Sequence, residues 1–445
     1  MEKYKWQSKI KLNIILLRIM GLWPEGDKTY EPGFYMVYSS ITVSLFVFGH
    51  IFFQVVNVYF IAHDLKSIVA TSYLLLMEIL GGVKAYYLIK NMKILKERMI
   101  NFKSDWFQPR NTQQRNLIEP TIYVWKRIYK VYLSMCFGGN TFWAIYPMMD
   151  KSEEKRLPFL GWYPYDYKKS PYYEITYIYQ VIGICYLSTL HVNVDQLISA
   201  FNVYTSSQFD MLRDNIRNLA NVDQTSSNDV YHMLRCVEHH KNILRFIESS
   251  TKFFNWILFW HLLFSGVSIG ITMFQLTAVV PFSSEFYSLL SYGLAITVQI
   301  FMHCWSGNEV QAKSGNLSYA VFESDWTDLP EDIKKKLFFF TMHLKPVQIS
   351  ALNLFYLSLD TYMRLMYYDR NYCLNWFNEI ANSERNVHFI HNKPRQPQIN
   401  TDSFEKQVDN VLVKNFSVID YISHRDFAES APTKTSYNTP DHVPT

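Results

Sequence analysis

Long apolar runs alternate with charged segments over the first three quarters of the chain. The longest extends from Phe253 to Ser284 without one Asp, Glu, Lys or Arg. A helix of about 18 or more apolar residues crosses the ~30 Å hydrocarbon layer of a bilayer. The pattern therefore predicts an all-α polytopic membrane protein with seven transmembrane helices. The expected spans are Tyr35–Ile61, Ile68–Leu88, Val131–Met149, Ile175–Ala200, Phe253–Val280 and Phe286–Trp305, with a weaker seventh that starts near Val347.

The Lys and Arg residues between these spans predict the orientation of the chain. The segments on one side (1–34, 91–127, 201–252 and 306–345) together hold 25 of them, and those on the other side hold six. Positive charge concentrates on the cytoplasmic side of membrane proteins. The N-terminus is therefore expected in the cytoplasm, and seven crossings would place the C-terminus outside. This orientation is the reverse of that of G-protein-coupled receptors.

The distribution of polar residues divides the chain into three parts. Residues 1–34 form a cytoplasmic segment in which Leu12–Trp23, behind four lysines, reads as an interfacial amphipathic helix. Residues 35–366 form the membrane domain. Residues 367–445 are a polar tail with no sustained periodicity, for which disorder is expected. The net charge of +4 is too small to indicate a nucleic-acid surface.

The two long cytoplasmic connections, 201–252 and 306–345, show helical periodicity. In the first, an apolar stripe (Phe209, Leu212, Ile216 and Leu219) recurs at helical spacing. The stripe either packs on its own bundle or contacts neighbouring subunits, and the sequence favours the second interpretation. A further helix is expected to begin near Glu331 and to break at Lys345-Pro346.

Nothing in the sequence indicates an enzyme, a metal or another cofactor. The chain has no phosphate loop, GxSxG elbow or HExxH motif. His191, His261 and His303 each lie alone in an apolar run, as hydrogen-bonded core histidines do. Glu78 and Lys84 interrupt the second span, so this helix is expected to face other helices or a wet cavity.

The third span offers a candidate cavity wall. Cys136, Gly139 and Trp143 fall at i, i+3 and i+7, on one face of a helix. Small residues leave room there, and the indole supplies a flat apolar wall with one donor, as a site for a lipophilic ligand requires. The alternative is that small residues on a membrane helix are packing contacts.

The segment after the sixth span carries a series of short motifs, and Leu157-Pro158-Phe159 opens a Tyr- and Pro-rich loop before the fourth span. Together with the topology, these features resemble insect odorant receptors, over about residues 8–366. The chain resembles a ligand-tuning subunit, because it lacks the long insertion of the universal co-receptor. The motifs are Gly307-Asn308-Glu309-Val310, Ser324-Asp325-Trp326, Asp328-Leu329-Pro330, Lys334-Lys335-Lys336-Leu337 and Ser358-Leu359-Asp360-Thr361-Tyr362.

The resemblance implies an odorant-gated, non-selective cation channel in the membrane of sensory neuron dendrites. It implies a hetero-tetramer with the co-receptor, held by a cytoplasmic anchor, and a pocket for a small volatile ligand between the second, third, fourth and sixth helices. The last helix would line the pore through Ser358, Asp360, Thr361 and Tyr362. The expected ligand-binding residues are Cys136, Gly139, Trp143, Tyr73, Met77, Tyr186, His191, Tyr287 and Tyr292.

The chain leaves the family pattern after Leu365. Only Pro346–Leu359 is uncharged in the last span, about 21 Å of helix, which is short of the ~30 Å needed. Asp360 and Arg364 have the spacing of a helical ion pair, but Asp369 and Arg370 are adjacent and do not share a face. The tail is either a true alternative ending of the protein or translated intron sequence. The abrupt loss of the family pattern favours the second interpretation. Asn415-Phe416-Ser417 would be glycosylated only if the tail were outside.

Overall fold

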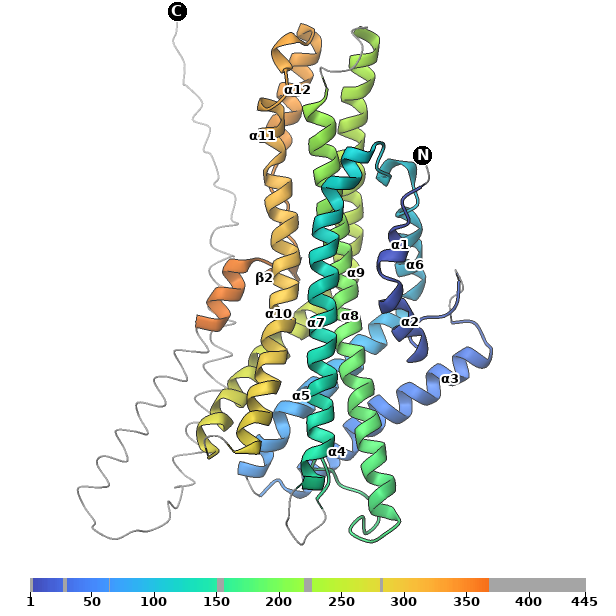
Figure 1. The fold of residues 1–445 in the computed structure, drawn as a ribbon, viewed down its shortest axis with the longest axis vertical. Coiled ribbons are helices and arrows are strands. Elements are labelled where there is room, and N and C mark those ends of the chain that lie inside the picture. Colours follow the sequence, from blue (N-terminus) through green and yellow to red (C-terminus); the bar gives the residue numbers. More distant parts are fainter. Residues whose placement is uncertain are drawn as a thin grey trace, which may run out of the picture. The chain divides into compact units, whose positions relative to one another are not determined.

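The computed structural model describes residues 3–26, 30–63, 65–149, 156–219, 226–280 and 283–367. Long helices form a bundle in which α8 contacts α7, α9 and α10, and α5 contacts α9 (Figure 1). The helices of the first half of the chain are α1 (Trp6–Lys9), α2 (Lys11–Ile19), α3 (Phe34–Val43), α4 (Gly49–Phe60), α5 (Leu65–Lys90), α6 (Met92–Asn101), α7 (Thr112–Met149) and α8 (Tyr172–Arg217). Those of the second half are α9 (Ser226–Ala278), α10 (Ser284–Gly315), α11 (Leu317–Phe322) and α12 (Glu331–His343).

The first six expected spans are all helical. A π-helical turn at Ser44–Phe48 joins α3 and α4 into one continuous helix. Within the described residues, five helical segments are long and apolar enough to cross a membrane: Phe34–Phe60, Thr71–Lys90, Tyr172–Arg217, Val230–Leu276 and Phe286–Phe322. The remaining expected span, Val131–Met149, forms the second half of α7. The prediction of an all-α polytopic membrane protein is thereby confirmed.

The N-terminal helix α2 has two apolar faces, one packed on the bundle and the other exposed. Leu17 is fully buried, and the Asn13 amide donates to the Asn193 carbonyl oxygen of α8 at 2.7 Å. Leu12 and Ile19, on the opposite face, are exposed. An exposed apolar stripe suits the interfacial position expected for this segment, while the buried face fixes α2 to α8.

The apolar stripe in the first cytoplasmic connection lies inside the subunit. Phe209, Leu212, Ile216 and Leu219 are all buried within this one chain. The interpretation that this stripe contacts neighbouring subunits is therefore wrong, and the alternative of packing on its own bundle holds. The reason is that α8 continues without interruption through residues 201–217, where α9 and α11 cover it.

The seventh helix does not start near Val347 as expected. After α12 the chain forms a short antiparallel pair, β1 (Ser350–Ala351) with β2 (Phe355–Tyr356), and becomes helical at residues 359–367. The turn places Leu352 and Asn353 at positive φ, and the Leu352 N–H donates to Asn255 Oδ1 at 2.6 Å. The predicted helix start near Glu331 is confirmed, and the helix ends at His343, two residues before the expected break at Lys345-Pro346. Asp369, Arg370 and the tail lie outside the described residues.

Candidate ligand cavity

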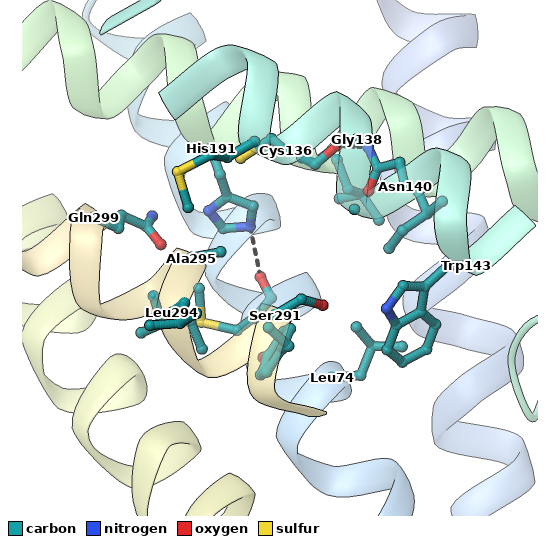
Figure 2. A pocket seen from close by; sticks show the side chains of 18 of the residues that line it. Leu74, Cys136, Gly138, Asn140, Trp143, His191, Ser291, Leu294, Ala295 and Gln299 are labelled. Carbon is teal, nitrogen blue, oxygen red and sulfur yellow. Dashed lines mark hydrogen bonds between the residues drawn. The ribbon is translucent and has the colours of Figure 1, made fainter. Parts of the chain in front are cut away.

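A cavity of about 330 Å³ lies among α5, α7, α8 and α10 (Figure 2). Its wall is mostly apolar and aromatic, with Phe159 added from the loop between α7 and α8. The volume is that of a small-molecule site, which in proteins measures roughly 300–1,000 Å³. The lining residues are Leu74, Met77, Glu78, Tyr132, Met135, Cys136, Gly138, Gly139, Asn140, Trp143, Phe159, Ile184, Leu187, Ser188, His191, Ser291, Tyr292, Leu294, Ala295, Ile296 and Gln299.

Helix α7 leaves this space because it carries two glycines where it faces the cavity. A Cβ added at Gly138 or Gly139 would meet no atom within 4 Å. Trp143, one turn further along, stacks on Phe159 with ring centroids 4.9 Å apart. The helical face predicted from Cys136, Gly139 and Trp143 therefore lines a cavity, whereas tight packing would have filled the space beside Gly139.

Six of the nine expected ligand-binding residues line the cavity, namely Cys136, Gly139, Trp143, Met77, His191 and Tyr292. The other three expected residues do not line the cavity. Tyr73 packs edge-on against Tyr292, 4.9 Å between ring centroids. The Tyr186 hydroxyl donates to the Met20 carbonyl oxygen at 2.7 Å, facing the N-terminal segment. Tyr287 is exposed on the outer surface of α10.

Several polar residues of the cavity wall, Asn140 and Gln299 among them, were not predicted from the sequence, whereas Glu78 lies on the span expected to face other helices or a wet cavity. Asn140 on α7 donates to Ser188 Oγ on α8 at 2.5 Å, and Gln299 projects from α10. Glu78 Oε1 accepts from Gln54 Nε2 at 2.7 Å. Asn140 directly follows Gly139 in the sequence, which could have suggested that it lies near the cavity. A single polar residue in an apolar run, however, does not show which neighbouring helix or space its side chain faces.

A buried ion pair lies behind this wall. Lys84 Nζ on α5 is 2.6 Å from Asp195 Oδ1 on α8, and both side chains are almost fully inaccessible. The Gln299 amide nitrogen donates to the other carboxylate oxygen. Charges within a membrane helix are stable only when they are paired. Lys84 therefore faces another helix and Glu78 lines the cavity, which are the two alternatives expected for this span.

Three histidines surround the ion pair and are not isolated from one another. His191 Nδ1 lies 3.1 Å from Lys84 Nζ, and His303 Nε2 lies 3.2 Å from Asp195 Oδ1. His261 is 3.8 Å from the same oxygen and packs edge-on against His303. All three are buried, as expected of core histidines, but α8, α9 and α10 bring them together around one ion pair.

The ligand atoms of Asp195, His261 and His303 lie within 4.8 Å of one another, a spacing compatible with a metal ion. The ammonium of Lys84, however, already contacts Asp195 and supplies the positive charge that a cation would bring. The group therefore serves as an ion-paired network that joins α5, α8, α9 and α10.

The expected pore residues lie at the start of the last described helix. Ser358 Oγ accepts from the Thr361 N–H at 3.2 Å, which caps this helix. Asp360 and Arg364 form the predicted ion pair, with 2.9 Å between Oδ2 and Nε, on an exposed face. Tyr362 packs on Phe301 of α10, 5.5 Å between ring centroids.

A helical bundle with an apolar cavity among its membrane-crossing helices defines a multi-pass membrane protein with a small-molecule-sized internal site. The 7tm Odorant receptor family model matches residues 64–367, and the chain belongs to this family. It is 22% identical to Odorant receptor 13a of Drosophila melanogaster over 80% of this chain and 92% of that one. It is also 22% identical to Odorant receptor Or1 of Anopheles gambiae, over 82% and 94%.

The fold is likewise that of a solved family member. The olfactory receptor OR5 of Machilis hrabei in complex with eugenol matches with a TM-score of 0.74 at 18% identity, covering 84% of this chain and 98% of that one. The resemblance predicted from the sequence motifs is thereby confirmed. So is the prediction that the chain is not an enzyme, because the family consists of receptors.

Proposed function

We propose that this chain is an odorant receptor subunit that binds a small volatile, lipophilic ligand in the cavity and gates a non-selective cation channel together with a co-receptor. The observation that carries the proposal is the apolar, aromatic cavity between α5, α7, α8 and α10. A solved relative of the same fold was determined in complex with eugenol, a small organic molecule. The proposed ligand-binding residues are those of the predicted set that line the cavity.

Replacing Trp143 by alanine should weaken ligand binding and leave folding intact. The substitution removes one aromatic wall that stacks on Phe159, and loss of such a contact costs about 1–3 kcal/mol of binding, which is a factor of about 5 to 150 in affinity. Binding is measured on the purified chain as the ligand-dependent rise in unfolding temperature over a broad odorant panel.

The matched control is Phe142→Ala. Phe142 is adjacent on α7, is exposed, and does not line the cavity. Its replacement should leave the stabilisation by every odorant unchanged. Equal stabilisation of the wild-type chain and of Trp143→Ala across the panel would place the ligand elsewhere.

The proposed partner is the co-receptor, in a hetero-tetramer held by the cytoplasmic anchor. The exposed apolar side chains of α11 and α12 support an interface there, since large apolar patches on a monomer mark contact sites. Five such residues are more than 60% exposed: Tyr319, Phe322, Phe338, Phe339 and Met342. These side chains replace the buried stripe of α8 as the proposed subunit contact.

The proposed orientation has seven crossings with the N-terminus in the cytoplasm, in the dendritic membrane of sensory neurons. The excess of Lys and Arg in the segments around α6, α9 and α12 supports it. The same excess argues against signalling through a G protein in the manner of receptors with the opposite orientation. An N-terminal epitope accessible to antibody on intact cells would contradict this orientation.

The chain as written should conduct poorly with the co-receptor. Asp369 and Arg370 follow the last described helix and cannot both pair on one helix face, and unpaired charge in lipid costs several kcal/mol. Replacing residues 366–445 by a short family-typical ending should restore odorant-evoked current in cells that express both subunits. Full current from the unaltered chain would show that the polar tail is compatible with a conducting pore.

A further inference from the structure

Several polar groups of the cavity wall are committed to partners within the protein, although the buried Oε2 of Glu78 has no hydrogen-bond partner among the described residues. His191 shows this most clearly, because both of its ring nitrogens are used. Nδ1 lies 3.1 Å from the Lys84 ammonium and Nε2 lies 2.9 Å from the Met77 carbonyl oxygen. An ammonium only donates and a carbonyl only accepts. The proton of His191 is therefore on Nε2, and the ring offers a ligand only its apolar face.

The hydroxyl groups of the wall are engaged in the same way. The Tyr292 hydroxyl donates to the Tyr73 carbonyl oxygen at 2.9 Å. Ser188 accepts from Asn140 and donates to the Cys185 carbonyl oxygen at 3.3 Å. Ser291 donates to the carbonyl oxygen of Ser288 at 2.8 Å. The protons of these hydroxyl groups are therefore already used within the protein, although the oxygens of Ser291 and Tyr292 can still accept a hydrogen bond.

Gln299 differs from these residues because its amide orientation is fixed from behind the wall. Its nitrogen donates to Asp195 Oδ2, and Asp195, as the partner of the Lys84 ammonium, is a carboxylate that only accepts. The Gln299 carbonyl oxygen must then point away from Asp195. Among the described residues none donates to that oxygen, and in Figure 2 the amide lies at the edge of the cavity.

We propose that the ligand of this cavity carries a hydroxyl group whose proton is accepted by the carbonyl oxygen of Gln299. The ligand class is a small, otherwise apolar alcohol or phenol. Trp143 lies across the cavity from Gln299 and stacks on Phe159 (Figure 2), so the apolar body of the ligand extends from Gln299 toward the aromatic wall. Asp195 acts as a positioning residue, since it holds the Gln299 amide in the accepting orientation.

This inference rests on the proposed function and is tested by pairs of isomers that differ only in the hydroxyl proton. The probes are 4-methylphenol against methoxybenzene, 2-phenylethanol against benzyl methyl ether, and 1-octanol against heptyl methyl ether. Each pair has one composition and similar apolar area, so area alone predicts equal affinity. Affinities are measured on the purified full-length chain from the concentration dependence of thermal stabilisation.

The hydroxyl isomers that bind should do so about threefold to tenfold more tightly than their ether partners, the range of one buried hydrogen bond. In Gln299→Met, which keeps the length of the side chain and removes the acceptor, the ratio should fall to about one. The matched control is Thr297→Val on the same helix. Thr297 donates to the Gly293 carbonyl oxygen at 2.9 Å and lies outside the cavity lining, so the ratio should persist.

Equal affinities of the isomers for the wild-type chain would overturn the inference, as would a ratio that survives in Gln299→Met. If that variant does not fold, Gln299→Asn is used, because it withdraws the oxygen by one methylene. The affinity ratio of the hydroxyl isomer to the ether isomer should again fall to about one. Failure of the proposed function has a different signature. In that case no odorant of the broad panel stabilises the chain, whereas failure of the hydroxyl inference alone leaves binding intact without preference for the proton donor.

Discussion

Replacing Asp195 by alanine should prevent most of the chain from reaching a stable folded state. The substitution leaves the Lys84 ammonium fully buried without its carboxylate partner. Breaking a buried ion pair by removing one partner costs about 3–5 kcal/mol, a large part of the roughly 5–15 kcal/mol by which a typical protein is stable. The measurement is the yield of monodisperse protein after detergent extraction, together with its unfolding temperature.

The matched test removes both charges at once. In Lys84→Met with Asp195→Leu, no uncompensated charge remains, and such apolar replacements of a buried pair are often neutral or stabilising. The double variant should therefore recover most of the yield lost in Asp195→Ala. A single variant as stable as the wild type would show that the two charges do not depend on each other.

Replacing Gly307 by alanine should uncouple the last helix from α10. A Cβ at this position would lie 2.4 Å from the Leu357 carbonyl oxygen and 2.5 Å from its Cβ. Backbone atoms must then move, at a cost of about 1–3 kcal/mol. Leu357 directly precedes Ser358, which caps the helix at residues 359–367. We expect odorant-evoked current to be lost in the channel that carries the family-typical ending, while thermal stabilisation by odorants persists.

Gly293→Ala is the control for this substitution. Gly293 lies on the same helix, and its added Cβ would meet only Thr272 Cγ2, at an ordinary contact distance of 3.7 Å. Current should be preserved in that variant. Normal current from Gly307→Ala would mean that the chain entering the last helix can shift without consequence for gating.

The helices and one wall of the cavity follow from local sequence patterns. Apolar length identified six spans, because a membrane helix must satisfy its backbone internally over a fixed thickness. The 3.6-residue period placed Cys136, Gly139 and Trp143 on one face, and all three line the cavity. Both inferences use only residues close together in the chain, for which helix geometry fixes relative positions.

What the sequence did not predict depends on residues that are far apart in the chain. Asp195 lies within the fourth span and Lys84 within the second, and their pairing follows only from the packing of α8 on α5. A carboxylate within a membrane span usually has a buried partner, so Asp195 alone already indicated that a positive charge lies nearby. The turn at Leu352 and Asn353 escaped prediction for another reason, since a short apolar run has no period that separates strand from helix.

The uninterrupted course of α8 has a mechanical consequence. Its 46 residues contain no proline, and one helix carries both Ser188 at the cavity and Ile216 near its C-terminal end. The 28 residues between them span about 42 Å, so a tilt of about 3° at the cavity moves the far end by about 2 Å. Displacements of about 1–2 Å are enough to switch helix contacts between subunits. The helix would thus act as a lever that enlarges a small movement at the cavity before it reaches α9 and α11, which cover the far end of α8.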